Sequence, residues 1–181
     1  VINASDKVDL GNGLPKYTFG FNFSLAWKGF DLSANFTGAA GFQIAQSYRD
    51  PSSSQANYSR RILKRWTGEG TSNEIPRVTY GDVGNWLFSD LYLQDGDYIR
   101  LQNLTMGYDF KKLISWKGLS KMRLYFQVQN LFTLTKYDGM DPEIGSFNGT
   151  DGNSSDSWVS GVDMGYYPHP RTFIVGLNLA F

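Results

Sequence analysis

Few side chains in this 181-residue sequence could carry out catalysis, because it contains one histidine and no cysteine. His169 stands between Pro168 and Pro170, with no second histidine or thiol to complete a zinc site or a nucleophile–base pair. A single histidine in a polar loop is usually structural or solvated. We therefore expect no catalytic residue, no metal ion, no cofactor and no disulfide framework.

Two groups of acidic and amide side chains could instead bind a cation. They are Asp138, Asp141 and Glu143, and Asp151, Asn153 and Asp156. Oxygen ligands suit calcium, but neither group has the spacing of an EF-hand loop or its final glutamate. Closeness in sequence does not establish the carboxylate pair of a glycosidase, and no phosphate-binding glycine loop or nucleophile elbow is present. Both groups are interpreted as solvated acidic loops.

Aromatic side chains in the expected loops could bind a ligand without catalysis. They are Trp66, Trp86, Trp158, Tyr166 and Tyr167. Flat aromatic faces stack on sugar rings and pack well at protein interfaces. The other interpretation is that each ring packs against its own loop, and the sequence leaves both open. We expect one or more of these rings to contact a ligand or a partner protein.

A basic segment precedes Trp66. Apolar residues recur there at helical spacing and are flanked by cationic side chains: Tyr58, Ile62, Leu63 and Trp66 beside Arg60, Arg61, Lys64 and Arg65. This pattern predicts a short amphipathic helix that ends near Gly68. The cationic side chains either form a solvated helix face or contact acidic lipid headgroups or an anionic ligand.

The last eleven residues, Arg171 to Phe181, predict the kind of element that positions these loops. Large apolar side chains occupy every second position of this segment: Phe173, Val175, Leu177, Leu179 and Phe181. The positions between them are mostly small or polar. Such alternation is typical of a β-strand, and roughly 9–11 residues are the length that a tilted strand needs to cross a bilayer.

Four further segments alternate in the same way. They are residues 17–27, 30–37, 98–110 and 122–129. Lys28-Gly29 predicts a tight turn between the first two. The alternation slips near Gln102-Asn103, which predicts a bulge or a strand end outside the membrane, and it slips again at Asn130-Leu131.

The connections between these strands alternate in length, as in outer-membrane barrels. The turn at 28–29 and the connection at 111–120 are short, whereas the loops at about 43–97 and 137–170 are long. Polar side chains on the other face of the strands would line the interior: Thr18, Asn22, Ser24, Ser33, Asn35, Thr105, Gln127 and Asn178. Five strands cannot close a barrel, so we expect an all-β, antiparallel transmembrane segment of a larger barrel, whose last strand pairs with a strand outside this chain.

Composition agrees with this class of protein. The formal net charge is zero, so nothing favours nucleic acid as a partner. Aromatic residues make up 16% of the chain and glycines number 20, which favours β structure with many turns. No run of eighteen apolar residues occurs, which excludes a helical membrane protein.

Several segments resemble the C-terminal part of the SusC/RagA family of TonB-dependent outer-membrane transporters. In chain order they are PKYTFGFN (15–22), KGFDLS (28–33), RWTGEG (65–70), YIRLQNLTMGYDF (98–110), QNLFTLTKYDGMDPEI (129–144) and GVDMGYYPHPRTFIVGLNLAF (161–181). Each motif alone is weakly specific, since alternating strands resemble one another. Their common order along nearly the whole chain is what makes the resemblance specific.

The resemblance implies a 22-stranded barrel in the outer membrane around an N-terminal plug domain, importing glycans or oligopeptides with energy from the TonB complex. A SusD-like surface lipoprotein would close the barrel as a lid and could contact the loop aromatics. Residues 1–181 would be the C-terminal portion of the barrel domain, non-enzymatic, without the plug domain or TonB box. Phe173, Val175, Leu177, Leu179 and Phe181 would form the signal for barrel assembly.

Three alternatives remain at this point. The first is a soluble all-β carbohydrate-binding domain, because aromatic loops on strands would serve that function equally well. The second is a TonB-dependent receptor of the siderophore or cobalamin type. The third is a small barrel enzyme of the outer membrane, which would need a clustered nucleophile and base that the sequence does not offer.

Overall fold

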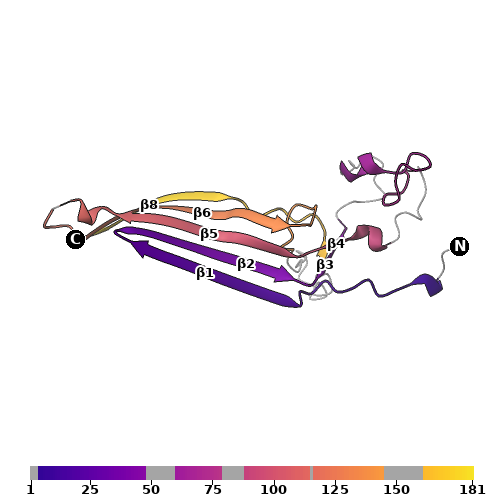
Figure 1. Ribbon diagram of the computed structural model, residues 1–181, viewed down its shortest axis with the longest axis horizontal. Coiled ribbons are helices and arrows are strands. Elements are labelled where there is room, and N and C mark those ends of the chain that lie inside the picture. Colours follow the sequence, from indigo (N-terminus) through magenta and orange to yellow (C-terminus); the bar gives the residue numbers. More distant parts are fainter. Residues whose placement is uncertain (1–3, 48–59, 79–87, 115, 145–160) are drawn as a thin grey trace, which may run out of the picture.

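One long antiparallel sheet dominates the molecule, a computed structural model that describes residues 4–47, 60–78, 88–114, 116–144 and 161–181. Its five strands follow one another in chain order: β1 (Tyr17–Trp27), β2 (Phe30–Ala40), β5 (Tyr98–Asp109), β6 (Lys121–Thr135) and β8 (Thr172–Ala180). Figure 1 shows them side by side along the longest axis of the molecule. The five expected strands are therefore confirmed.

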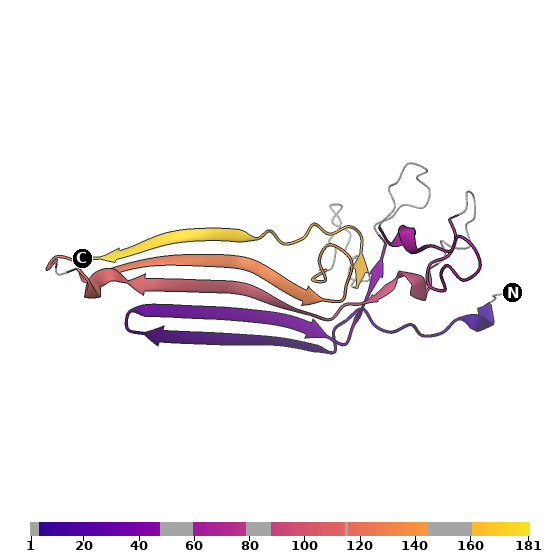
Figure 2. The same ribbon diagram turned by 45° about the horizontal axis from the view of Figure 1, so that its top comes forward.

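The two ends of the sheet differ in the length of their connections. Lys28 and Gly29 turn β1 into β2 with positive φ angles of 50° and 97°, as a tight hairpin of the twisted kind requires. At the same end, the β5–β6 connection contains the 3₁₀ helix η5 (Phe110–Lys112), where the side chain of Asp109 accepts a hydrogen bond from the Lys111 N–H. Both long connections lie at the other end (Figure 2).

The two expected shifts in alternation, at Gln102-Asn103 and at Asn130-Leu131, lie opposite each other on the paired strands β5 and β6 and belong to one irregularity. Leu101 pairs with Phe132 and Asn103 with Gln129, so that Gln102 on β5 faces two residues of β6. One of these two, Asn130, has a φ of 52°. An extra residue on one strand is a β-bulge, and it restores the alternation beyond it. The prediction of a bulge at this place is confirmed.

Register places most of the large apolar side chains of the five strands on one face. One row across the sheet consists of Leu25, Leu32, Met106, Phe126 and Val175, and the next of Phe23, Ala34, Leu104, Val128 and Phe173. Most of the large side chains on this face are exposed, including all six of β1. An exposed apolar face of this extent requires a covering.

The two long connections contain a second, small sheet, so the interpretation of them as loops without strands is wrong. This sheet contains β3 (Gln43–Gln46), β4 (Leu93–Asp95) and β7 (Val162–Asp163), in the order β4-β3-β7. β3 and β7 pair in parallel, and they join the first long connection to the second. Strands of two to four residues are too short to show a period in the sequence.

The described residues have a small buried core beside this second sheet. Its buried members are Ala39, Phe42, Ile44 and Tyr137, with Tyr98 and Ile144 packed against them. These residues come from the end of β2, the start of β5 and both long connections. The core therefore fastens the bases of the two connections to the end of the large sheet.

The other helices among the described residues are short 3₁₀ helices: η1 (Ala4–Asp6), η2 (Arg60–Lys64) and η4 (Asp90–Tyr92). The expected amphipathic helix is wrong in length and type, because η2 is a five-residue 3₁₀ helix and Tyr58 lies outside the described residues. Its last turn closes through a hydrogen bond from the Arg65 N–H to the Ile62 carbonyl. In the part of the chain that is described, no helix is both long and apolar enough to cross a membrane.

Gly38 on β2 marks a place where the ring of Phe19 lies directly over the backbone. A Cβ at this position would come within 2.6 Å of the Phe19 ring and of the Tyr98 carbonyl oxygen, which is backbone and cannot move aside. Gly38→Ala is therefore expected to lower the free energy of unfolding by about 1–3 kcal/mol, because the added methyl group overpacks this place. Urea unfolding measures this cost. Gly20→Ala is the control, since its nearest contact is 3.7 Å away.

Candidate functional site

The polar face of the large sheet is the first candidate surface. Register aligns Asn22, Asn35, Asn103 and Gln129 in one row and Ser24, Ser33, Thr105 and Gln127 in the next. The Asn35 amide donates to Asn22, and the Gln127 amide donates to Asn103 at 3.4 Å. All eight side chains expected to face the interior lie on this face, the others being Thr18 and Asn178. The two rows consist of neutral hydrogen-bonding groups.

An ion pair lies on the same face near the short connections. Arg123 on β6 donates to the Asp31 carboxylate on β2, with its Nε 2.8 Å from Oδ1. The pair crosses over Gly107 on β5, where a Cβ would lie 2.6 Å from both partners. The Arg123 guanidinium also lies 5.0 Å from the ring centre of Tyr125. A glycine between the two charges is thus what permits the pair.

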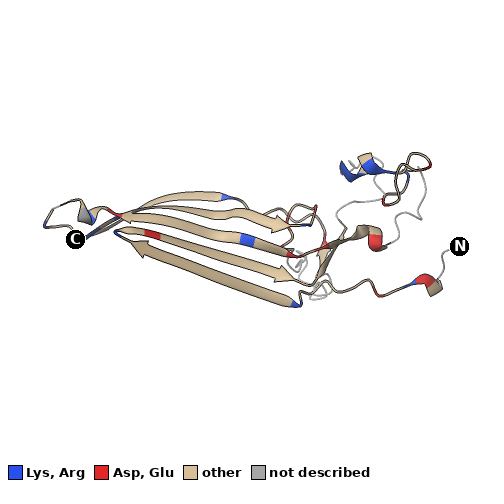
Figure 3. Ribbon diagram, viewed as in Figure 1, with Lys and Arg blue, Asp and Glu red and all other residues tan. Residues whose placement is uncertain are grey.

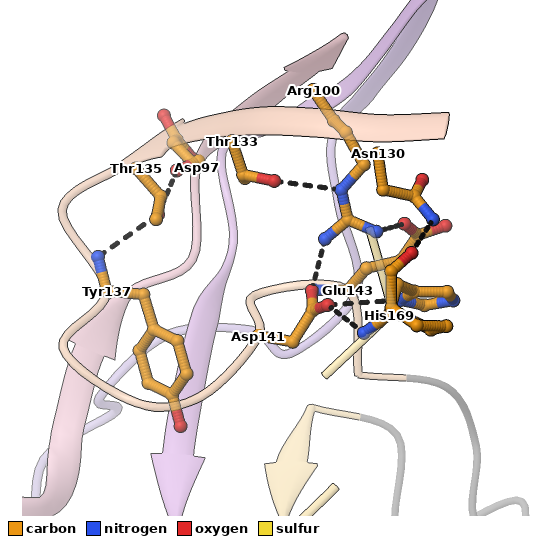
Figure 4. A network of polar contacts seen from close by, with 10 residues as sticks. Asp97, Arg100, Asn130, Thr133, Thr135, Tyr137, Asp141, Glu143 and His169 are labelled. Carbon is orange, nitrogen blue, oxygen red and sulfur yellow. Dashed lines mark hydrogen bonds and ion pairs between the residues drawn. The ribbon is translucent and has the colours of Figure 1, made fainter. Parts of the chain in front are cut away.

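A buried network of charges lies at the other end of the sheet. Arg100 on β5 is 2% exposed and forms ion pairs with the carboxylates of Asp141 and Glu143, the latter at 2.7 Å. Its Nε donates to the Thr133 hydroxyl at 2.9 Å. Figure 4 shows the guanidinium surrounded by these partners. Arg100 therefore joins two strands of the large sheet to the second long connection.

Asp141 is the centre of this network. Its carboxylate accepts hydrogen bonds from the backbone N–H of Glu143 at 2.9 Å and of His169 at 3.1 Å, and it lies 3.0 Å from the His169 ring nitrogen. Burial alone would raise the pKa of Asp141, but these hydrogen bonds and that of Arg100 outweigh it and hold the pKa below its ordinary value. The carboxylate is ionised and fully used as an acceptor.

This geometry corrects the interpretation of the acidic loop as solvated. Asp141 is 5% exposed, because two residues distant in sequence, Arg100 and His169, surround it. Asp138 is more exposed, yet it accepts from the Gln46 amide at 2.8 Å and forms an ion pair with Arg61 at 3.5 Å. The second acidic group, at 151–156, lies outside the described residues.

His169 has a structural role, which is one of the two roles, structural or solvated, expected for it from the sequence. Its ring and its backbone both bind Asp141, and the Asn130 amide donates to the carbonyl of the neighbouring Pro170 at 3.1 Å. The bulge on β6 and the segment before β8 are thereby joined. Among the described residues, no three histidine, cysteine or acidic side chains are grouped so as to hold a metal ion.

A second buried carboxylate was not expected from the sequence. Asp163 on β7 is 1% exposed and accepts hydrogen bonds from the Tyr137 hydroxyl and from the backbone N–H groups of Gly165 at 2.8 Å and Tyr166 at 3.1 Å. The sequence signal that could have found it is an aspartate two residues before a glycine, which is typical of an Asx-turn.

Known proteins with this sequence pattern are TonB-dependent receptors, although no family model matches the chain. TonB-dependent receptor P3 of Formosa agariphila is 35% identical over 99% of this chain, and SusC of Bacteroides thetaiotaomicron is 28% identical over 99%. The solved structure of the RagAB peptide transporter matches 96% of the chain with a TM-score of 0.73 at 24% identity, and shows the same fold. The chain belongs to the SusC/RagA-type TonB-dependent receptors.

The chain spans only part of such a receptor. It covers 18% of the length of receptor P3, 16% of SusC and 18% of the matched RagAB chain. The expected segment of an antiparallel transmembrane barrel in the outer membrane is confirmed by the family and the shared fold. The division into a C-terminal barrel portion without plug domain stays a prediction.

Membership in this family accounts for the exposed apolar face of the receptor segment. Rows of exposed Phe, Leu and Val side chains are what the lipid-facing side of an outer-membrane barrel presents. Aromatic residues mark the end with the short connections: Trp27, Phe30, Tyr108, Trp116 and Phe181. Aromatic side chains of barrels are enriched at such a height, where the membrane meets water.

Of the aromatic side chains expected to contact a ligand or lid, the three that the structure describes do not line one common groove. Trp66 is 40% exposed and lines a groove that includes neither Tyr166 nor Tyr167. Tyr167 is 85% exposed, whereas Tyr166 is half-buried. Trp86 and Trp158 lie outside the described residues. A role in binding stays a prediction for all five.

Acid is expected to open the Asp141 network of the receptor segment only below about pH 4. Because the folded chain holds the pKa of Asp141 below the unfolded value of about 3.9, its stabilisation is complete above that value and is lost as the pH falls through the folded pKa. Amide hydrogen exchange at Glu143 and His169 between pH 7 and 3 measures this loss. Opening already between pH 7 and 5 would contradict the prediction.

Proposed function

We propose that this chain supplies barrel strands and extracellular loops to a TonB-dependent importer of large nutrients, either glycans or oligopeptides. The observation that carries the proposal is the 35% identity with a TonB-dependent receptor over 99% of the chain. Similarity to SusC and the fold shared with the RagAB peptide importer agree with it. The partners would be the TonB complex and a SusD-like surface lipoprotein, besides the lipid of the outer membrane.

The two faces of the large sheet support this function physically. Lipid would cover the apolar face, and the neutral amide and hydroxyl rows of the polar face would line a wet interior through which polar nutrients pass. The Arg100–Asp141 network and the small core would hold the bases of the long loops rigidly at the extracellular mouth. β1 and β8 each pair with a single described strand, so we propose that strands elsewhere in the receptor complete the barrel.

Two sets of residues have proposed roles in this importer. The aromatic residues Trp66, Trp86, Trp158, Tyr166 and Tyr167 would contact nutrient or lid lipoprotein. Side chains of the last strand would form the assembly signal: Phe173, Val175, Leu177, Leu179 and Phe181. The latter are all exposed on the apolar face or at its end, where an assembly factor could bind them before lipid does.

Uptake by cells tests the function. Cells with the intact receptor are expected to import fluorescent oligosaccharides or peptides, and deletion of the receptor or of TonB should abolish this import. The lid lipoprotein should copurify with the receptor. Alanine variants of the five aromatic residues then measure their individual roles. Import that is unchanged without TonB would refute the proposal, and wild-type uptake and lid binding in all five variants would refute the aromatic contacts.

A further inference from the structure

A groove at the loop end, apart from the Arg100 network, is built from one short stretch of chain. It is a shallow depression, wide open to solvent, with a volume of about 510 Å³. The residues that line it are Trp66, Ser72, Asn73, Glu74, Ile75, Pro76 and Arg77. It follows η2, which lies beyond the end of the large sheet (Figure 1).

Local hydrogen bonds hold the groove in shape. The Trp66 N–H donates to the Ile75 carbonyl at 2.8 Å, which closes the stretch into a loop. The Thr71 hydroxyl donates to the Gly68 carbonyl at 2.7 Å, and the Ser72 hydroxyl accepts from the Ile75 N–H at 3.2 Å. A site fixed in advance loses less conformational freedom when a ligand binds.

The groove combines an aromatic face with polar side chains. Trp66 is 40% exposed, and Ile75 and Pro76 continue the apolar surface beside it. Asn73, Glu74 and Arg77 supply an amide, a carboxylate and a guanidinium. Their groups can donate to and accept from the hydroxyls of a sugar ring whose C–H face stacks on the indole.

The stretch of chain that contains η2 and the groove has a net positive charge, although the groove itself is lined by one cationic and one acidic side chain, Arg77 and Glu74, and the chain as a whole is neutral. Residues 60–77 contain five cationic side chains and two acidic ones. In Figure 3, blue marks Lys and Arg along the ribbon of η2 and just after it. Arg61 is paired with Asp138, but within the described residues Arg60, Lys64 and Arg77 form no ion pair. Such a local field favours anionic ligands.

We propose that this groove binds an anionic sugar, with the ring stacked on Trp66 and its carboxylate or sulfate held by Arg77. The inference rests on the proposed import function and names the class of nutrient that the receptor captures at its surface. A peptide fits less well, because the described residues between 60 and 78 contain no strand edge that could pair with an extended backbone.

Binding to the full-length receptor in detergent tests this inference. The probes are tetragalacturonate, a sulfated galactan tetramer, neutral maltotetraose and a tetraglutamate peptide. One of the two acidic sugars is expected to bind at least about tenfold more tightly than maltotetraose, with an affinity that falls as salt rises. The two acidic probes distinguish carboxylate from sulfate.

Two variants assign the binding to this groove. Trp66→Ala should lower the affinity for acidic and for neutral sugars alike, by roughly three- to tenfold. Arg77→Gln should weaken only the acidic sugar, by about tenfold, and so remove the preference. Gly68→Ala is the matched control in the same loop, since nothing lies within 4 Å of the added carbon, and it should bind like the wild type.

Three results would overturn the inference. The first is equal affinity of the receptor for acidic and neutral sugars. The second is wild-type affinity for sugars in the Trp66→Ala variant. The third is a loss of affinity for tetraglutamate, in both variants, that is as large as the loss of affinity for the acidic sugar. Each variant is first checked for wild-type thermal unfolding. Failure of the proposed import function would show in a different experiment, as uptake that persists without TonB. The failure of the groove proposal and the failure of the import proposal are therefore distinguishable.

Discussion

Replacement of Arg100 by methionine is expected to lower the free energy of unfolding of the loop end by about 3–5 kcal/mol. The guanidinium is 2% exposed and neutralises Asp141, which is itself 5% exposed. Without Arg100, the Asp141 carboxylate would remain buried with hydrogen-bond donors but without a countercharge. Removal of one partner from a buried ion pair costs far more than the pair contributes, because the remaining charge is poorly solvated.

Native-state hydrogen exchange at the amides of Glu143 and His169 measures this loss, since both donate to Asp141. Arg61→Gln is the control, because the Arg61–Asp138 pair is solvated and should contribute less than about 1 kcal/mol. Arg100→Met combined with Asp141→Asn should recover part of the stability, since asparagine keeps an acceptor and removes the charge. Equal effects of Arg100→Met and Arg61→Gln would contradict the buried network.

Phe23→Arg is expected to lower the free energy of unfolding in a lipid bilayer by about 2–4 kcal/mol, because the proposed barrel places this side chain against lipid. Phe23 lies near the middle of β1, and its row across the sheet contains Ala34, Leu104, Val128 and Phe173. A guanidinium at this depth would have to leave water or pull water and headgroups into the hydrocarbon. In a soluble protein with the same exposed side chain, the substitution would be almost neutral.

Urea unfolding of the receptor refolded into lipid vesicles measures this cost. Ser24→Arg is the matched control, because Ser24 is the next residue of the same strand and lies on the polar face. It should change the free energy of unfolding by far less than Phe23→Arg. Equal costs for the two substitutions would mean that lipid does not cover the apolar face.

The sequence predicted the large sheet well, because each of its strands is long and has one apolar face. Nine to fifteen residues with a period of two leave little doubt about which side chains share a face. Lys28-Gly29 predicted its turn, since that conformation needs positive φ at both positions. Even the bulge was visible, because one extra residue shifts the alternation of both partner strands.

The loop end was predicted poorly, because its structure depends on contacts between distant parts of the chain. β3 and β7 are short, and their pairing joins residues more than a hundred positions apart. Asp141 was interpreted as solvated, since nothing beside it in the sequence shows that Arg100 and His169 surround it. For the same reason the burial of Asp163 under Tyr137 was not expected.

The sequence by itself determined the strands, their two faces and the alternation of short and long connections. These features follow from side-chain direction along an extended backbone, which is a local property. Only the tertiary structure decided which acidic side chains are buried, how the two long connections are fastened together, and that Trp66 lines a groove beside a cluster of positive charge. Those features depend on distances between residues that no local pattern specifies.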